Sequence, residues 1–230
     1  MKKKKFYWES KNKALSRIMH SNAGMISINW FFQGILGMDK TERVFKIFIE
    51  LLSIIIMTLI LNNLFNLIFA IIMSFITIHS LNWLLNAHFY DAVGRFFSLC
   101  EMSEAKMVDY LNSVKDRAER NKSIMGILVI GGITRGKKIG PTSDLDIRFV
   151  RNKGFINGIR ASMFSFNERV KAFYQKFPLD LYTYDNLTSL DKLRKDEAPI
   201  IVLDPDNVLK KKYKERGYSL LEEWKMRGQQ

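Results

Sequence analysis

The sequence predicts a mixed α/β (α+β) domain with a small mixed sheet flanked by helices, preceded by a helical hairpin that crosses or enters a membrane. One observation predicts each part. Residues 47–90 contain no Lys or Arg and are strongly apolar. After residue 91, short β-branched segments alternate with amphipathic segments of helical periodicity, a pattern typical of domains that combine helices with a sheet. A chain of 230 residues is long enough for both parts.

The net charge of +13 lies on both sides of the apolar stretch. Residues 1–46 hold ten Lys and Arg against three acidic residues, a balance of +7, and residues 91–230 hold 26 against 19, again +7. Positive flanks predict that both ends of the stretch lie on the cytoplasmic side of the cytoplasmic membrane. The single cysteine, Cys100, excludes a disulfide framework and agrees with that reducing compartment. Because no recognisable nucleic-acid-binding module accompanies the charge, we do not expect a nucleic acid as partner.

Residues 1–43 are predicted to form a basic and aromatic juxtamembrane segment. In it, the basic run Lys2–Lys5 is followed by Phe6, Tyr7 and Trp8. Basic clusters are attracted to anionic headgroups by ~1 kcal/mol per charge, and aromatic rings favour the membrane interface. The composition therefore indicates proximity to a membrane, and a solvated N-terminus is the alternative.

Residues 44–90 are predicted to form the membrane hairpin, with helices at about 45–61 and 64–81. Each helix has close to the ~20 residues needed to cross the hydrocarbon layer, and Asn62-Asn63 form the turn between them. A re-entrant hairpin remains an alternative, because Glu50 and the paired asparagines are costly deep in a bilayer. A buried hairpin inside a soluble domain is the other alternative.

Residues 91–230 are predicted to form one cytoplasmic domain without repeats. Its strands are recognised as short apolar, β-branched runs, and its helices by charged residues interleaved with apolar ones at helical spacing. In chain order we expect a helix at 103–121, strands at 124–130 and 145–150, a helix at 155–177, strands at 179–184 and 199–203, and a basic helix at 206–216.

Two glycines, Gly131 and Gly132, follow the first predicted strand directly. They allow the backbone to turn sharply and to approach a ligand without an intervening side chain. If Ile133 opens a helix, its free N–H groups point at this turn and favour a phosphate there.

Three carboxylates are spaced so that a sheet can bring them together. Asp144 and Asp146 lie at the start of the second strand, and in extended backbone they share one face, because alternate strand residues point the same way. Asp180, between Leu179 and Leu181, has the matching position on the next strand. Clustered carboxylates repel one another unless a cation lies between them, and hard oxygen ligands suit Mg²⁺.

Gly131-Gly132, then Asp144-Leu-Asp146, then a later strand with Asp180 resemble the polymerase-β-like nucleotidyltransferase superfamily. The run Gly-Gly-Ile-Thr-Arg-Gly followed by Ser-Asp-Leu-Asp is especially similar to the minimal and kanamycin-nucleotidyltransferase-like groups. The resemblance covers roughly residues 104–206 and implies a nucleotidyltransferase fold. Gly132 stands where the family usually has a serine that helps to hold the triphosphate.

The resemblance also implies roles for individual residues. The metal ligands would be Asp144, Asp146 and Asp180, which would hold two Mg²⁺ ions, or Mn²⁺ in their place. Asp180 would in addition help to deprotonate the attacking hydroxyl. The residues that would contact the nucleotide are Gly131, Gly132, Thr134, Arg135 and Ser143.

The expected function is a membrane-anchored, Mg²⁺-dependent transfer of a nucleoside monophosphate from an NTP to a hydroxyl or phosphate, with release of pyrophosphate. The expected partners are an NTP, the lipid bilayer, and an acceptor such as a lipid-linked or surface-glycan precursor, since anchoring suits an acceptor held at the membrane. Transfer to a protein side chain is the second possibility. A catalytically silent nucleotide-binding membrane scaffold is the third.

Overall fold

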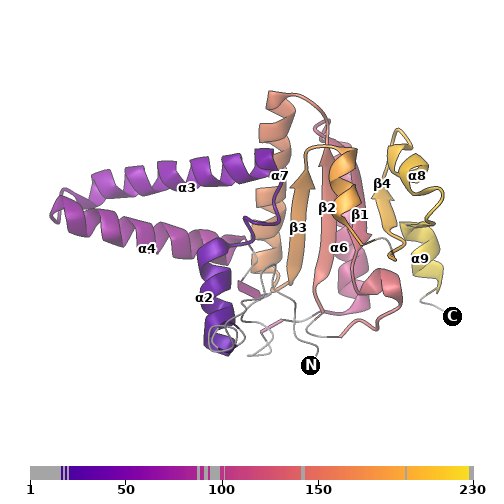
Figure 1. Ribbon diagram of the computed structural model, residues 1–230, viewed down its shortest axis with the longest axis horizontal. Coiled ribbons are helices and arrows are strands. Elements are labelled where there is room, and N and C mark those ends of the chain that lie inside the picture. The colour runs from indigo at the N-terminus through magenta and orange to yellow at the C-terminus, as the bar shows by residue number, and fades with distance from the viewer. Residues whose placement is uncertain are drawn as a thin grey trace.

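The computed structural model describes residues 17, 19, 21–86, 89–90, 93, 99–100, 102–140, 143–194 and 196–227. The predicted basic run Lys2–Lys5 and its aromatic neighbours lie outside the described residues. Figure 1 shows two parts: a sheet covered by helices, and two long helices that project from one side of it.

A five-stranded mixed sheet has the strand order β3-β2-β1-β4-β5. The central strand β1 (Ile124–Ile130) is antiparallel to both β2 (Leu145–Arg151) and β4 (Ile200–Leu203). At the edges, β3 (Leu179–Tyr184) runs parallel to β2, and β5 (Ser219–Leu220) runs parallel to β4.

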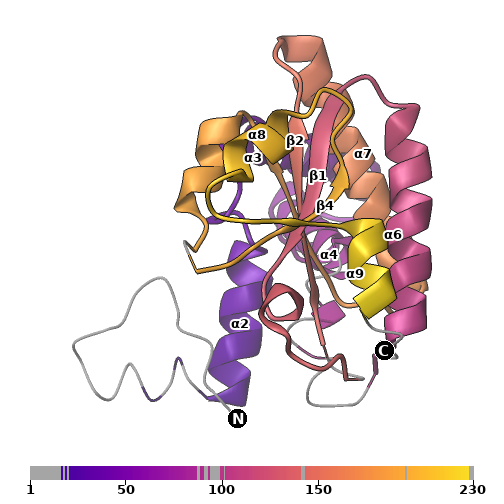
Figure 2. The ribbon, with the colours of Figure 1, turned by 90° about the vertical axis from the view of Figure 1, so that its right-hand side faces the viewer.

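Helices cover both faces of this sheet (Figure 2). On one face, α6 (Glu104–Glu119), α7 (Phe155–Tyr174) and α9 (Leu221–Arg227) enclose the main core. On the other face, η3 (Leu187–Lys192) and α8 (Val208–Tyr213) cover a smaller cluster.

Strand β2 shows the two-residue alternation that the sequence predicts. Leu145, Ile147 and Phe149 are fully buried against α6 and α7. Asp146 and Arg148 therefore point to the opposite face, where the smaller cluster lies. The alternation places charged side chains at one end of that second face.

The hairpin consists of α3 (Lys40–Leu61) and α4 (Leu67–Leu85), packed against each other and projecting away from the sheet (Figure 1). Both helices are long and apolar enough to cross a membrane. Their large apolar side chains point outward; Leu59 is 65% exposed and Ile68 is 72% exposed. The alternative of a hairpin buried in a soluble core therefore does not describe this structure.

The second hairpin helix differs from the prediction at both ends. It begins at Leu67 rather than residue 64, because Asn66 is its N-cap and accepts a hydrogen bond from the Phe69 N–H. It ends at Leu85, four residues later than expected. The first helix ends at Leu61 as predicted, but it begins earlier, at Lys40.

Polar residues at the base of the hairpin have hydrogen-bond partners. Glu50 contacts the His79 ring and accepts a hydrogen bond from Asn82, so its carboxylate is not isolated among apolar side chains. The helix α2 (Asn22–Phe32) packs there, and the Trp30 carbonyl lies 3.0 Å from the other nitrogen of the His79 ring. His79 thus has a structural hydrogen-bonding role.

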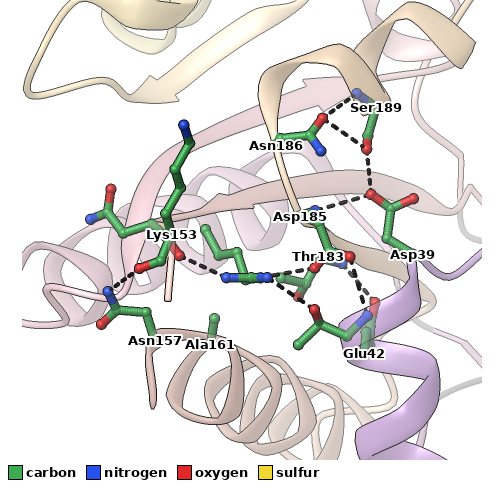
Figure 3. Close-up of polar contacts among 12 residues, drawn as sticks. Asp39, Glu42, Lys153, Asn157, Ala161, Thr183, Asp185, Asn186 and Ser189 are labelled. Carbon is green, nitrogen blue, oxygen red and sulfur yellow. Dashed lines mark hydrogen bonds and ion pairs between the residues drawn. The ribbon is translucent and has the colours of Figure 1, made fainter. Parts of the chain in front are cut away.

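The start of α3 is joined to the outer edge of β3 (Figure 3). The backbone N–H of Thr183 donates to Glu42 (2.8 Å), and the N–H of Asp185 donates to Asp39 (3.0 Å). These carboxylates occupy the side of β3 that has no neighbouring strand in the sheet. Glu42 also forms an ion pair with Arg169 of α7, and both side chains are buried. The hairpin is therefore held to the domain by buried charges.

The other element predictions are largely confirmed. The strands at 124–130 and 179–184 have the predicted bounds, and the remaining predicted strands and helices differ by a few residues at their ends. The condition stated for a phosphate at a helix N-terminus is not met, because Ile133 opens only a three-residue 3₁₀ turn, η2 (Ile133–Arg135). A turn of this length presents no α-helix N-terminus to a phosphate. Cys100 is buried.

Candidate active site

Two of the three predicted carboxylates meet at the end of β2 and β3. Asp146 pairs in register with Asp180, on adjacent parallel strands, and the two carboxyl groups share a hydrogen bond. Each side chain is 20% exposed, so both are accessible from solvent. Burial and then the negative charge of Asp180 raise the pKa of Asp146 well above its usual range.

Asp144 lies immediately before β2 instead of on it. It is close enough that its negative charge contributes to the raised pKa of Asp146. Within the described part of the chain, however, no three His, Cys, Asp or Glu side chains are grouped closely enough to hold a metal ion. The structure thus brings Asp146 and Asp180 together and leaves Asp144 beside them.

Gly131 is required at the turn by both its backbone and its surroundings. Its φ is +91°, which side-chain-bearing residues rarely adopt. A Cβ atom at this position would lie 1.9 Å from Oδ2 of Asp146, which is closer than non-bonded atoms can approach. The glycine therefore allows the carboxylate to lie directly against the turn backbone. At Gly132 a Cβ would meet the Lys137 side chain at 3.1 Å.

An internal carboxylate occupies the turn that was predicted to bind phosphate. Glu197, which precedes β4, accepts a hydrogen bond from the Gly131 N–H (3.1 Å) and forms an ion pair with Arg135. The side chain of Glu197 is 5% exposed. A backbone N–H and a guanidinium are the donors that an anionic oxygen prefers, and here the anion comes from the chain itself.

The two predicted hydroxyl groups stabilise the loop itself. Thr134 donates to the Gly131 carbonyl (3.0 Å) across η2. Ser143 accepts from the Gly140 N–H (2.9 Å) and closes the last turn before β2. Neither bond excludes a further contact, because a hydroxyl group has both donor and acceptor capacity.

Arg148 is the main site residue that the sequence interpretation underrated. Arginine side chains are mostly exposed, but that of Arg148 is only 8% exposed. It donates to the Asp180 carboxylate (3.1 Å) and to the Asp180 carbonyl (2.7 Å), and its guanidinium lies over the Tyr182 ring. The charges of Asp180 and Asp146 raise its pKa despite burial, so it stays cationic. Its Nε is buried without a partner among the described residues.

This arrangement has a clear chemical capacity. Two adjacent carboxylates at a solvent-accessible strand end, with a glycine turn packed against one of them, form a set of hard oxygen donors suited to Mg²⁺ or Mn²⁺. Arg148 forms ion pairs with Asp180 (3.1 Å) and Asp146 (3.9 Å) and so offsets part of their negative charge. A hollow of about 400 Å³ elsewhere on the surface, between α6, β4 and α9, is lined by none of these residues.

Comparison of the chain with protein-family models, with curated proteins and with solved structures finds no match. The comparisons therefore assign the chain to no family.

Proposed function

We propose that the chain is a membrane-anchored nucleotidyltransferase that moves a nucleoside monophosphate from an NTP to an acceptor at the membrane surface. The observation that carries the proposal is the pairing of Asp146 with Asp180 on parallel strands, with Gly131 packed against Asp146. The same residues carry the resemblance to the polymerase-β-like superfamily, and their order along the chain is that of the resemblance.

In the proposed reaction an oxygen of the acceptor attacks the α-phosphorus of the NTP. The bond from that phosphorus to the bridging oxygen breaks, and pyrophosphate leaves. Mg²⁺, held by Asp146 and Asp180 with Asp144 beside them, would neutralise charge on the phosphates when bound. Asp180 accepts the proton of an attacking hydroxyl group. Arg135 and the N–H of Gly131 bind phosphate oxygens in place of Glu197.

Anchoring is proposed from the hairpin. In α3 and α4 the outward-facing apolar side chains form a surface that suits lipid better than water. The basic flanks of the hairpin favour a cytoplasmic catalytic domain, where NTPs are available. An acceptor that is itself held at the membrane, such as a lipid-linked sugar or headgroup precursor, fits this placement.

The direct test measures pyrophosphate release by the full chain in lipid nanodiscs. Labelled NTPs are supplied with Mg²⁺ or Mn²⁺ and a panel of lipid-linked and soluble acceptors. Asp146→Asn and Asp180→Asn should each lower the rate by about 10²-fold or more, the usual effect of removing charge stabilisation at a reacting phosphate. Asp191→Asn is the matched control, because Asp191 is 65% exposed and its ion pair is with Lys212. Absence of metal-dependent pyrophosphate release with every acceptor would refute the proposal.

Two ion pairs favour a second candidate, a catalytically silent nucleotide sensor. Arg148 neutralises Asp180, and Glu197 occupies Arg135, so both halves of the site are internally compensated. A sensor would bind an NTP tightly without releasing pyrophosphate. Equilibrium binding of a labelled NTP, measured beside turnover on the same sample, separates the two functions.

A further inference from the structure

Helix α7 carries an exposed apolar face near its N-terminus. This α7 apolar face consists of Phe155, Ile156, Ile159 and Met163, which are 80%, 57%, 38% and 42% exposed. The opposite side of α7 is packed into the core through small residues such as Ala161 and Ala172. Four large apolar side chains on one helix face are more than scattered surface residues, and they indicate a surface that is covered in the working protein.

The α7 apolar face begins where the hairpin joins the domain. Gly158 of α7 lies so close to Thr41 of α3 that a Cβ on the glycine would be 2.7 Å from the Thr41 methyl group. One helical turn further, Ser162 lines a small hollow together with α3 residues. Ile159 and Met163 each follow one of these contact residues, which rotates them by about 100° around the helix. Ile159 and Met163 therefore lie beside the hairpin, on the solvent-exposed side of α7.

The charges around this face are positive. Lys153, Arg160 and Lys171 are exposed on α7 and on the loop before it. The acid in α7, Glu168, is buried and forms ion pairs with Arg117 and Lys171. An apolar strip bordered by exposed Lys and Arg is the composition of a helix that lies in a membrane interface. Each such cation near an anionic surface contributes about 1 kcal/mol of attraction.

We propose that α7 lies along the surface of an anionic bilayer, with the α7 apolar face at the boundary between headgroups and acyl chains. Figure 1 shows α7 running across the direction of the hairpin at its root, so a bilayer crossed by α3 and α4 has its surface along α7. The hairpin then fixes the distance of the domain from the bilayer, and α7 fixes the rotation of the domain about the hairpin axis. Strand β3, with Asp180, becomes the strand nearest the headgroups. The inference rests on the proposed membrane insertion of the hairpin and names the lipid surface that the domain contacts.

The test uses the full chain with Cys100 replaced by Ser and single cysteines introduced for a fluorescent label. Ile159→Cys and Met163→Cys report on the α7 apolar face. Leu59→Cys, on the exposed side of α3, is the positive control, and Ser113→Cys, exposed on α6, is the negative control. The labelled proteins are placed one per nanodisc of phosphatidylcholine and phosphatidylglycerol, with and without lipids that carry a quenching group near the headgroup.

Labels at 159 and 163 should lose most of the fluorescence that the label at 59 loses, and the label at 113 should lose little. Adding Arg160→Glu to the Met163→Cys protein, or omitting phosphatidylglycerol, should weaken the quenching at 163 and leave that at 59 unchanged. If 59 is quenched but 159 and 163 behave like 113, the inference on α7 fails while membrane anchoring stands. If 59 is also unquenched, the anchoring proposal fails with it. If the labels at 159 and 163 are shielded from water but are not quenched by the lipids, a protein partner covers the α7 apolar face, and this result would likewise overturn the inference.

Discussion

Replacing Glu42 by Ala should loosen the junction between the hairpin and the domain that contains the sheet. Glu42 is 2% exposed and Arg169 is 4% exposed, so the substitution leaves the Arg169 guanidinium buried without its carboxylate. The N–H of Thr183 also loses its acceptor on the outer edge of β3. Removing one partner of a buried ion pair costs about 3–5 kcal/mol, and an unpaired N–H adds about 1–3 kcal/mol that is not fully additive. We expect a loss of about 3–5 kcal/mol in the free energy of opening at β3.

Hydrogen exchange of the full chain in nanodiscs, followed by mass spectrometry, measures this loss locally. Peptides that cover β3 should exchange about 10²-fold faster or more, since each 1.4 kcal/mol corresponds to a factor of ten. The peptides of β4, at the other side of β1, provide the internal reference. The double variant Glu42→Leu with Arg169→Met removes both charges and should recover much of the protection.

The outcome that contradicts this reasoning is a change of less than about 1 kcal/mol in Glu42→Ala, the value of a solvent-exposed pair. Glu42 would then be a surface residue in solution, and the hairpin would be a loose tether. Equal losses in the single and the double variant would also contradict it, because the cost would not come from an uncompensated charge.

Three further predictions concern the turn and the start of α3. Gly131→Ala should abolish pyrophosphate release by displacing Asp146. The control is Gly136→Ala, where φ is +70° and an added Cβ would meet no surrounding atom within 4 Å; it should cost only about 1–2 kcal/mol of stability in thermal unfolding. Glu197→Gln should tighten NTP binding roughly tenfold, measured by calorimetry, because the charged carboxylate no longer competes with the NTP phosphates for the donors of the turn. Weaker binding would assign Glu197 a positioning role. At Asp39, hydrogen bonds outweigh burial and lower the pKa of the carboxyl group in the folded protein. The charged carboxylate therefore stabilises the fold above its unfolded pKa of about 4, and this stabilisation is lost as pH falls through the folded pKa. Asp39→Asn should lower the free energy of unfolding at pH 7 and much less at pH 3, as measured by urea unfolding.

Local patterns explain what the sequence predicted correctly. The strand Ile124–Ile130 is recognisable as a short, continuous apolar run, because it is buried on both faces of the sheet. In Leu179–Tyr184 and in β2, burial repeats every two residues at the start of the strand, and the neighbouring side chains reveal this alternation. The same alternation places Asp146 and Asp180 on one face without knowledge of the register. It also places Arg148 on that face, so strand parity was a usable signal for Arg148 that the sequence interpretation did not apply.

Other parts of the site depend on contacts between distant residues. Glu197 lies 66 residues from Gly131, and no spacing rule links a loop acid to a turn N–H so far away. The length of η2 could not be predicted either, because Gly136 ends it after three residues with a left-handed backbone.

The predicted division of the chain between residues 43 and 44 follows composition. The contacts of the residues just before it show why composition misplaces such a boundary. Asp39 and Glu42 are charged residues before an apolar run, which in sequence marks the end of a membrane segment. In the structure they are buried and bond the edge of β3, and Glu42 does so with a partner 141 residues away. A carboxylate that satisfies strand N–H groups takes the place of a neighbouring strand and protects an edge that would otherwise pair with other chains. The first turn of α3 therefore belongs physically to the sheet, and the strand that carries Asp180 is stabilised by the same residues from which the hairpin begins.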